Sequence, residues 1–212
     1  MKREHVAAVC VIVVITVGVI YFLLPTPLNI SDLSWDVEVG DTFKFDIRAW
    51  GEAYGGSYTP SQVLPLNDTS ITVSVTFLPT FDAVNNADTF SSEIIFRNKI
   101  NCTFTNGTAL DEWINTIFCE IISGCILPTG AWSSIDSLFP DDTPSWEPGE
   151  DAIATILYDT WFFIEYKLYG SIDDTRGWSG DISLSTGAPY VIVWYYAHGP
   201  YEPLTIQLTR TE

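Results

Sequence analysis

Basic side chains are scarce in this sequence. Its 212 residues include 9 Lys and Arg against 27 Asp and Glu, so the formal net charge is −18. The absence of a basic footprint argues against a nucleic-acid partner, and the same charge disfavours binding to an anionic lipid surface. The acidic residues indicate a solvated acidic surface, with a cation-binding surface as the alternative. Disorder is excluded, because 47% of the residues are hydrophobic and only 17% are charged.

Residue patterns that carry catalytic or metal chemistry are also missing. The sequence has no Gly-x-Ser-x-Gly motif, no closely spaced His and Cys ligands and no phosphate-binding glycine loop after a strand. His198 lies in the segment AHGPYEP and is interpreted as an exposed residue of a hairpin turn. The acidic pairs at 141–142 and 173–174 are interpreted as solvated loop acids rather than a glycosidase pair. We therefore expect no catalytic residue, no cofactor and no metal.

A long uncharged run occupies the N-terminus. Residues 6–24 read VAAVCVIVVITVGVIYFLL, close to the ~20 residues that span a bilayer. Lys2 and Arg3 precede the run, which predicts a cytoplasmic N-terminus. A cleaved signal peptide is the alternative, but its apolar region would be shorter, about 7–15 residues, and followed by a small-x-small cleavage site. We predict a single-pass protein of the cell membrane.

The predicted anchor divides the chain into three parts. They are a cytoplasmic tip with the transmembrane helix at 1–24, a linker at 25–34 and one extracytoplasmic domain at 35–212. Four Asn-x-Ser/Thr sequons follow the anchor, at Asn29, Asn67, Asn101 and Asn106. Four sequons downstream of a helix with its N-terminus inside predict an extracellular glycoprotein.

The cysteines of the domain form an odd set: Cys102, Cys119 and Cys125. At most one bridge forms among three cysteines, and an oxidising compartment permits it. A strand, a short turn and an antiparallel helix would place Cys119 about 16 Å along the helix from Cys102. A bridge between those two is therefore not expected. We predict a Cys119–Cys125 disulfide with Cys102 buried and reduced, and Cys102–Cys125 as the alternative.

Alternating apolar and polar residues predict strands over 43–49 and 71–77. A third strand is expected over about 93–104, with Ile94 on its apolar face and Lys99 on its polar face. Further strands are expected in the C-terminal third, near 152–158, 160–169, 180–185, 189–197 and 203–210.

One amphipathic helix is expected over 109–122. Thr108 with Asp111 resembles a capping box, and Gly124 is a candidate stop. The segment YVIVWYY at 190–196 is apolar on both faces, so we expect the sheet to be covered on both sides there. The helix is the best candidate cover.

These elements predict an α+β fold. We expect a curved, mostly antiparallel, half-barrel-like sheet of seven or eight strands, with the amphipathic helix packed in its concave face and the transmembrane helix in front. A two-sheet β-sandwich with a helical insertion is the alternative.

Two stretches resemble uncharacterised membrane-anchored surface proteins of archaea. They are NGTALDEWINTIFCEIISGCILPTGAW, and STGAPYVIVWYY followed by LTIQLTR. The layout is similar as well, with a VGDTF-type first strand, a Leu-Pro-Thr-Gly-x-Trp turn and a Thr-Gly before the last hairpin. The resemblance implies an archaeal surface protein and brings no activity or functional residue with it.

Aromatic residues are the remaining functional indication, with 8 Trp, 10 Tyr and 12 Phe. Trp50, Tyr54 and Tyr58 flank a glycine-rich loop, where exposed rings could stack on sugars or contact a partner. We expect a non-enzymatic binding module at the cell surface, whose partner is an apolar ligand between sheet and helix or another surface protein. The alternatives are a structural envelope component and a glycan-processing hydrolase. An apolar cavity favours the first, a filled core the second, and two acids in a deep cleft the third.

Overall fold

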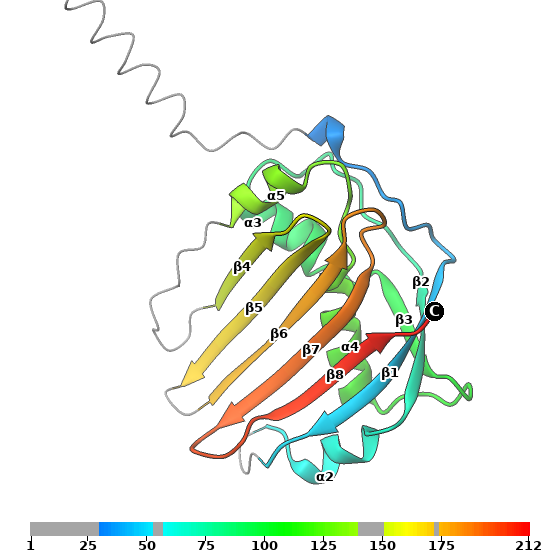
Figure 1. The fold of residues 1–212 in the computed structure, drawn as a ribbon, viewed down its shortest axis with the longest axis vertical. Coiled ribbons are helices and arrows are strands. Elements are labelled where there is room, and N and C mark those ends of the chain that lie inside the picture. Colours follow the sequence, from blue (N-terminus) through cyan, green and yellow to red (C-terminus); the bar gives the residue numbers. More distant parts are fainter. Residues whose placement is uncertain (1–29, 53–56, 140–150, 172–173) are drawn as a thin grey trace, which may run out of the picture.

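The protein folds around one open, curved antiparallel sheet of eight strands (Figure 1). The computed structural model describes residues 30–52, 57–139, 151–171 and 174–212. The strands are β1 (Thr42–Trp50), β2 (Ser70–Val75), β3 (Ile100–Phe104), β4 (Asp151–Leu157), β5 (Trp161–Ser171), β6 (Asp174–Ser183), β7 (Pro189–His198) and β8 (Leu204–Arg210). The helices are α2 (Pro60–Val63), α3 (Ala87–Phe90), α4 (Glu112–Cys125) and α5 (Trp132–Leu138), with shorter turns η1 (Ile30–Asp32), η2 (Leu64–Leu66) and the π-helical η3 (Ser91–Ile95). The predicted α+β class and the curved antiparallel sheet are confirmed.

The strand order explains why a helix crosses the sheet. The order is β3-β2-β1-β8-β7-β6-β5-β4, so β3 and β4, which follow each other in sequence, lie at opposite edges. The connection between them must cross one face, and it carries α4 and α5. In Figure 1, α4 lies behind the middle strands, and α3 and α5 lie near the β4 edge. The first and last strands pair in the interior of the sheet, where Ile47 is opposite Leu208.

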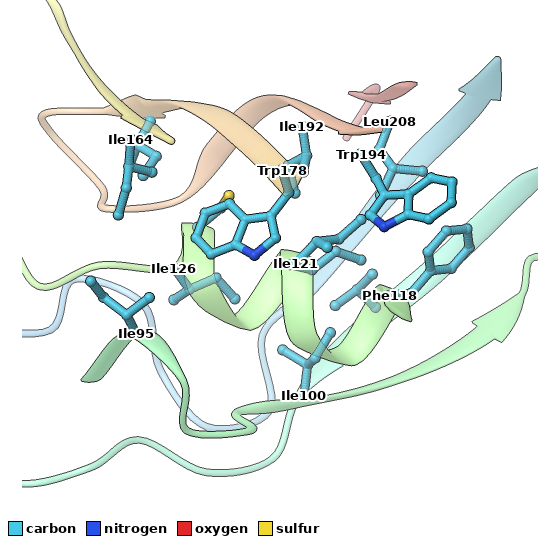
Figure 2. Packing of buried hydrophobic residues seen from close by; sticks show 14 of the residues in the cluster. Ile95, Ile100, Phe118, Ile121, Ile126, Ile164, Trp178, Ile192, Trp194 and Leu208 are labelled. Carbon is cyan, nitrogen blue, oxygen red and sulfur yellow. The ribbon is translucent and has the colours of Figure 1, made fainter. Parts of the chain in front are cut away.

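Helix α4 packs closely against the concave face (Figure 2). The Trp178 ring lies so close to Gly124 that a Cβ atom built on that glycine would be 2.5 Å from the ring. A Cβ on Gly180 would overlap the sulfur of Cys125. Glycine is required where a helix and a strand approach this closely. The helix–sheet interface is therefore filled by side chains, and the core residues all fall between Leu33 and Leu208.

Several predicted boundaries differ from the structure. The third strand begins only at Ile100, because Ser91–Ile95 forms the π-helix η3 with Ile94 and Ile95 both buried. Two neighbouring buried residues suit a helical turn and not a strand, in which successive side chains point to opposite faces. Strand β6 begins at Asp174 and so includes residues expected to form a loop.

The ends of the main helix were also predicted wrongly. Asp111 is the N-cap residue of α4, and the Thr108 hydroxyl donates instead to Asn106 Oδ1 at 2.7 Å. Gly124 lies inside the helix rather than after it, where it makes room for Trp178.

Coverage of strand β7 on both sides is not observed. Ile192, Trp194 and Tyr196 are buried on the concave face, whereas Val191 and Val193 on the convex face are only half-buried. The apolar character of the outer residues thus does not require a second layer.

The expected anchor at 6–24 lies outside the residues that the structure describes. In the described ranges, every helix is too short or too polar to cross a membrane.

Candidate binding groove beside helix α4

An open groove runs along the N-terminal half of α4, where the helix diverges from the aromatic floor of the sheet. Its volume is about 650 Å³. The lining residues come from α4, β6 and the segment before α2, and they are Tyr58, Glu112, Trp113, Thr116, Ile117, Glu120 and Arg176. An open space of this size is within the range of small-ligand sites.

The helical spacing of residues on α4 and the alternation of side chains on β6 bring these groups to the groove. Trp113, Ile117 and Glu120 follow each other at intervals of four and three residues, so they line one edge of α4. On β6, Arg176 is two residues before Trp178 and shares its concave face. The groove therefore has an aromatic and acidic wall from the helix and a basic residue from the sheet.

Tyr58 is held in the groove by neighbouring rings. Its ring meets Trp194 edge-on at 5.1 Å and Tyr196 at 5.0 Å between centroids, and it is tilted against Trp113 at 6.3 Å. The backbone N–H of Ser57 donates to the Tyr196 hydroxyl at 3.1 Å. These contacts fix the aromatic wall before any ligand arrives, which lowers the entropic cost of binding.

Below the groove lies a narrow space of about 20 Å³ between α4 and the sheet. Tyr166, Trp178 and Trp194 contribute to its lining. Trp178 is 1% exposed, and its indole Nε1 has no hydrogen-bond partner in the described part of the chain. A buried donor without an acceptor is costly, so an acceptor that entered this space from the groove would be stabilised there.

The charges around the groove are uneven. Glu120 lies at the exposed rim, yet partial burial raises the pKa of its carboxyl, and nearby Arg176 opposes the shift. The Tyr166 hydroxyl donates to Asp151 Oδ2 at 3.4 Å. Burial, followed by the negative charges of Asp151 and Glu120, raises the pKa of Tyr166 to about 12. The groove thus combines aromatic rings, a carboxyl with a raised pKa and one guanidinium.

Lys99 is the residue that the sequence interpretation missed most clearly. It was expected on the polar face of a strand, but it is fully buried. Its Nζ donates to the carbonyl oxygens of Ile94 and, at 2.7 Å, of Ser123. These carbonyls lie near the C-terminal ends of η3 and α4, where backbone acceptors carry partial negative charge. The Ser123 carbonyl also accepts a hydrogen bond from the Ile126 N–H at 3.3 Å.

Burial lowers the pKa of Lys99 to about 7, and the neighbouring Cys125 opposes the shift. Lys99 is therefore a buried cap for two helices rather than a surface charge. The apolar and polar alternation around it contains no feature that would have indicated this.

The cysteine geometry differs from the expected one. Cys119 and Cys125 both belong to α4, and six residues along a helix are about 9 Å apart, beyond the ~7 Å limit for a bridge. All three cysteines are free thiols. Cys125 packs on Gly180, whereas the Cys119 sulfur lies 3.9 Å from the carbonyl oxygen of Ile100, two residues before Cys102 on β3. The predicted Cys119–Cys125 pairing is incompatible with this helix, and the predicted distance between Cys102 and Cys119 was wrong.

Three of the four predicted glycosylation sites fall in the described residues. Asn67, Asn101 and Asn106 are all exposed. Asn106 Oδ1 accepts hydrogen bonds from the backbone N–H and the hydroxyl of Thr108, so the sequon forms a compact turn. Asn29 lies outside the described residues.

His198 is not in a turn but ends β7, half-buried. Its ring stacks on Tyr196 at 6.3 Å between centroids. The acidic residues at 141–142 and 173 lie outside the described residues, as does Tyr54. In the described parts of the chain, no three His, Cys, Asp or Glu side chains gather as a metal site would require.

Comparisons with protein-family models, curated proteins and solved structures give no match. The site is therefore interpreted from its own geometry.

Proposed function

We propose that the chain is a membrane-anchored extracytoplasmic binding module that holds its ligand in the groove beside α4. The observation that carries the proposal is the open groove of about 650 Å³ with Tyr58 and Trp113 on its wall and Glu120 and Arg176 at its rim. Rings of this kind offer apolar faces, and the two charged groups offer hydrogen bonds that orient a ligand.

The ligand that best suits this lining has a flat apolar face and several hydroxyl groups, such as a sugar ring of a cell-surface glycan. An apolar ligand between helix and sheet is less compatible, because Gly124 and Gly180 allow Trp178 and Cys125 to fill that interface. Glu120 and Asp151 both raise the pKa of Tyr166, and both are exposed at the surface. This arrangement supports sugar binding over glycan hydrolysis.

The extracytoplasmic location is supported by the uncharged run at 6–24 and by the sequons. The exposure of Asn67, Asn101 and Asn106 is compatible with glycans at all three positions. The resemblance of the α4 segment to archaeal membrane-anchored surface proteins points the same way.

The test compares two tryptophans, the half-buried Trp113 and the exposed Trp50, in the full-length protein in detergent. Glycans released from the surface of the source cells are passed over immobilised wild type, Trp113→Ala and Trp50→Ala. Trp113 lines the groove, whereas Trp50 is 40% exposed at the end of β1 and outside the groove lining. Retention by wild type and Trp50→Ala, with loss in Trp113→Ala, supports the proposal. Absence of retention by wild type, or equal retention by all three, contradicts it.

A structural envelope component is the second candidate. The filled core favours it, as do the stacked Tyr158 and Trp161 rings, with centroids 4.0 Å apart near the β4–β5 hairpin. Chemical crosslinking on intact cells distinguishes the two functions, because a structural component forms stoichiometric protein crosslinks and a glycan-binding module does not require them.

A further inference from the structure

Two of the three thiols meet where β3 passes α4, on the side of the helix that faces Ile100 in Figure 2. We propose that Cys102 and Cys119 form a disulfide that ties the edge strand β3 to α4. The proposal is independent of the ligand in the groove and concerns a different face of the helix.

The two cysteines come from two different elements, Cys102 from strand β3 and Cys119 from helix α4. Cys102 is buried on the inner face of β3, on the same side as Ile100. The Cys119 Sγ lies 3.9 Å from the Ile100 carbonyl oxygen and 3.7 Å from Asn115 Oδ1. Cys102 and Cys119 lie close enough for each to shift the pKa of the other. A disulfide requires Cα atoms within about 7 Å, and thiols that face each other from two packed elements suit that requirement.

The two thiols differ in their exposure to solvent. Cys119 is half-buried and lines an open space of about 460 Å³ together with Asn98, Asn115 and Glu120. Cys102 is only 4% exposed. The hydrogen bond from Cys102 lowers the pKa of Cys119, while that bond and burial raise the pKa of Cys102. Cys119 is therefore the thiol that meets an oxidant and reacts first, since the thiolate is the nucleophile.

The oxidant is a disulfide of a small thiol or of a thiol oxidoreductase. The Cys119 thiolate attacks one sulfur of that disulfide, breaks its S–S bond and releases one thiol, which leaves a mixed disulfide on Cys119. Cys102 then loses its proton and attacks the Cys119 sulfur, which releases the second thiol. The protein loses two S–H bonds and gains one S–S bond, and the oxidant's disulfide takes up two electrons and two protons.

Cys125 does not compete for either partner. It is fully buried on a different side of the helix, where its sulfur lies against Gly180 and its charged neighbours include Lys99 and Asp181. It therefore serves as an internal reference thiol.

The test is peptide mapping of the full-length protein in detergent after treatment with oxidised glutathione. Trypsin leaves the three cysteines in one peptide, because no Lys or Arg lies between Lys99 and Lys167. A protease that cleaves after Glu112 and Glu120 separates them into peptides 94–112, 113–120 and 121–150, because the bond between Glu147 and Pro148 resists cleavage. The protein is deglycosylated first, because two sequons fall in the first of these peptides, and free thiols are alkylated before cleavage.

We expect peptide 113–120 to be joined to peptide 94–112, two hydrogens lighter than the sum, with Cys125 alkylated. In Cys102→Ala, Cys119 should keep glutathione as a stable adduct, and Cys125→Ala should leave the bridge intact. Alkylation of both Cys102 and Cys119 in oxidised wild type would overturn the proposal, and so would a link from Cys119 to any other cysteine. An unmodified Cys119 in Cys102→Ala would contradict its assignment as the attacking thiol.

Discussion

The two ends of helix α4 meet the same sheet in different ways. At the C-terminal end, Gly124 and Cys125 press against Trp178 and Gly180, and no space is left. At the N-terminal end, Trp113 is only partly buried and lines an open groove. The charged groups also differ, because the closed end holds the buried amine of Lys99 and the open end carries acids at its rim.

This difference separates residues that hold the fold from residues that are free to recognise a ligand. Close packing at one end fixes the position and angle of the helix. The other end can then present rings and charges without itself supplying the stability of the domain. Substitutions at the closed end should change the free energy of unfolding, whereas substitutions at the open end should mainly change binding.

The largest effect is expected for Gly124→Ala. Alanine in a helix is favoured over glycine by about 1 kcal/mol, but its Cβ would lie 2.5 Å from the buried Trp178 ring. Overpacking of a core typically costs about 1–3 kcal/mol, so after the gain in helix propensity we expect a net loss of up to about 2 kcal/mol. Urea unfolding of the fragment 30–212, kept reduced, measures it.

The matched control is Thr116→Ala, at an exposed position of the same helix. It gains helix propensity without a clash and should be neutral or slightly stabilising. Equal stability of Gly124→Ala and Thr116→Ala would show that the two ends are packed alike, against the comparison above.

A smaller effect is expected from Lys99, whose titration should make the free energy of unfolding depend on pH. Its pKa is about 7 in the folded protein and 10.5 when exposed, so between these values the unfolded chain binds the extra proton. Unfolding free energy should therefore rise with pH, by about 1 kcal/mol between pH 7 and pH 8. Below pH 7 both states are protonated and the contribution stays constant. Lys99→Met should flatten this rise in urea unfolding measured at both pH values.

Arg97→Gln is the control for Lys99→Met. Arg97 is two residues away and pairs with Glu93 at 2.8 Å, but its side chain is 54% exposed. Exposed pairs contribute little, so the rise with pH should persist in this variant. A rise that persists in Lys99→Met as well would mean that another group titrates.

The smallest effect is expected for Glu120→Gln at the open end. The pKa of Glu120 is raised in the folded protein, so its contribution to stability is present at acidic pH and decreases as pH rises through the folded pKa. This sign is opposite to that of Lys99. Because solvent screens an exposed charge, Glu120→Gln should stabilise the fragment at pH 7 by only a few tenths of a kcal/mol. Differential scanning calorimetry at pH 4 and pH 7 measures the change, and destabilisation at pH 7 would contradict it.

Local periodicity predicted the elements that have one buried face. Strands β1 and β2 and most of α4 follow the alternation of their residues, and Ile117 and Ile121 are buried as the helical stripe required. The prediction failed for residues 91–99, because the pattern of Ile94 and Lys99 suits a strand as well as it suits a helical turn. Only the tertiary fold brings the Ser123 carbonyl to Lys99.

The groove could not be predicted for a similar reason. Tyr58 and Trp113 are separated by more than fifty residues in the sequence, and their contact depends on where the sheet connection crosses. Tyr58 was noted beside a glycine-rich loop, but nothing in the sequence indicates that it turns inward to Trp194. The same crossing brings Cys102 to Cys119, which a simple antiparallel strand–helix pair would have kept apart.

The pairing of β1 with β8 has a consequence for biosynthesis. Strands β1–β3 and strands β4–β8 form two runs of neighbours, and only the contact between the first and the last strand joins them into one sheet. A nascent chain that lacks Leu204–Arg210 has β1–β3 and β4–β7 but not the strand that connects them. Until that strand has been synthesised, β1 and β7 each expose an unpaired edge, which is a hazard for aggregation. The domain therefore completes its fold only after β8 has been made, and a chaperone has most to protect just before that moment.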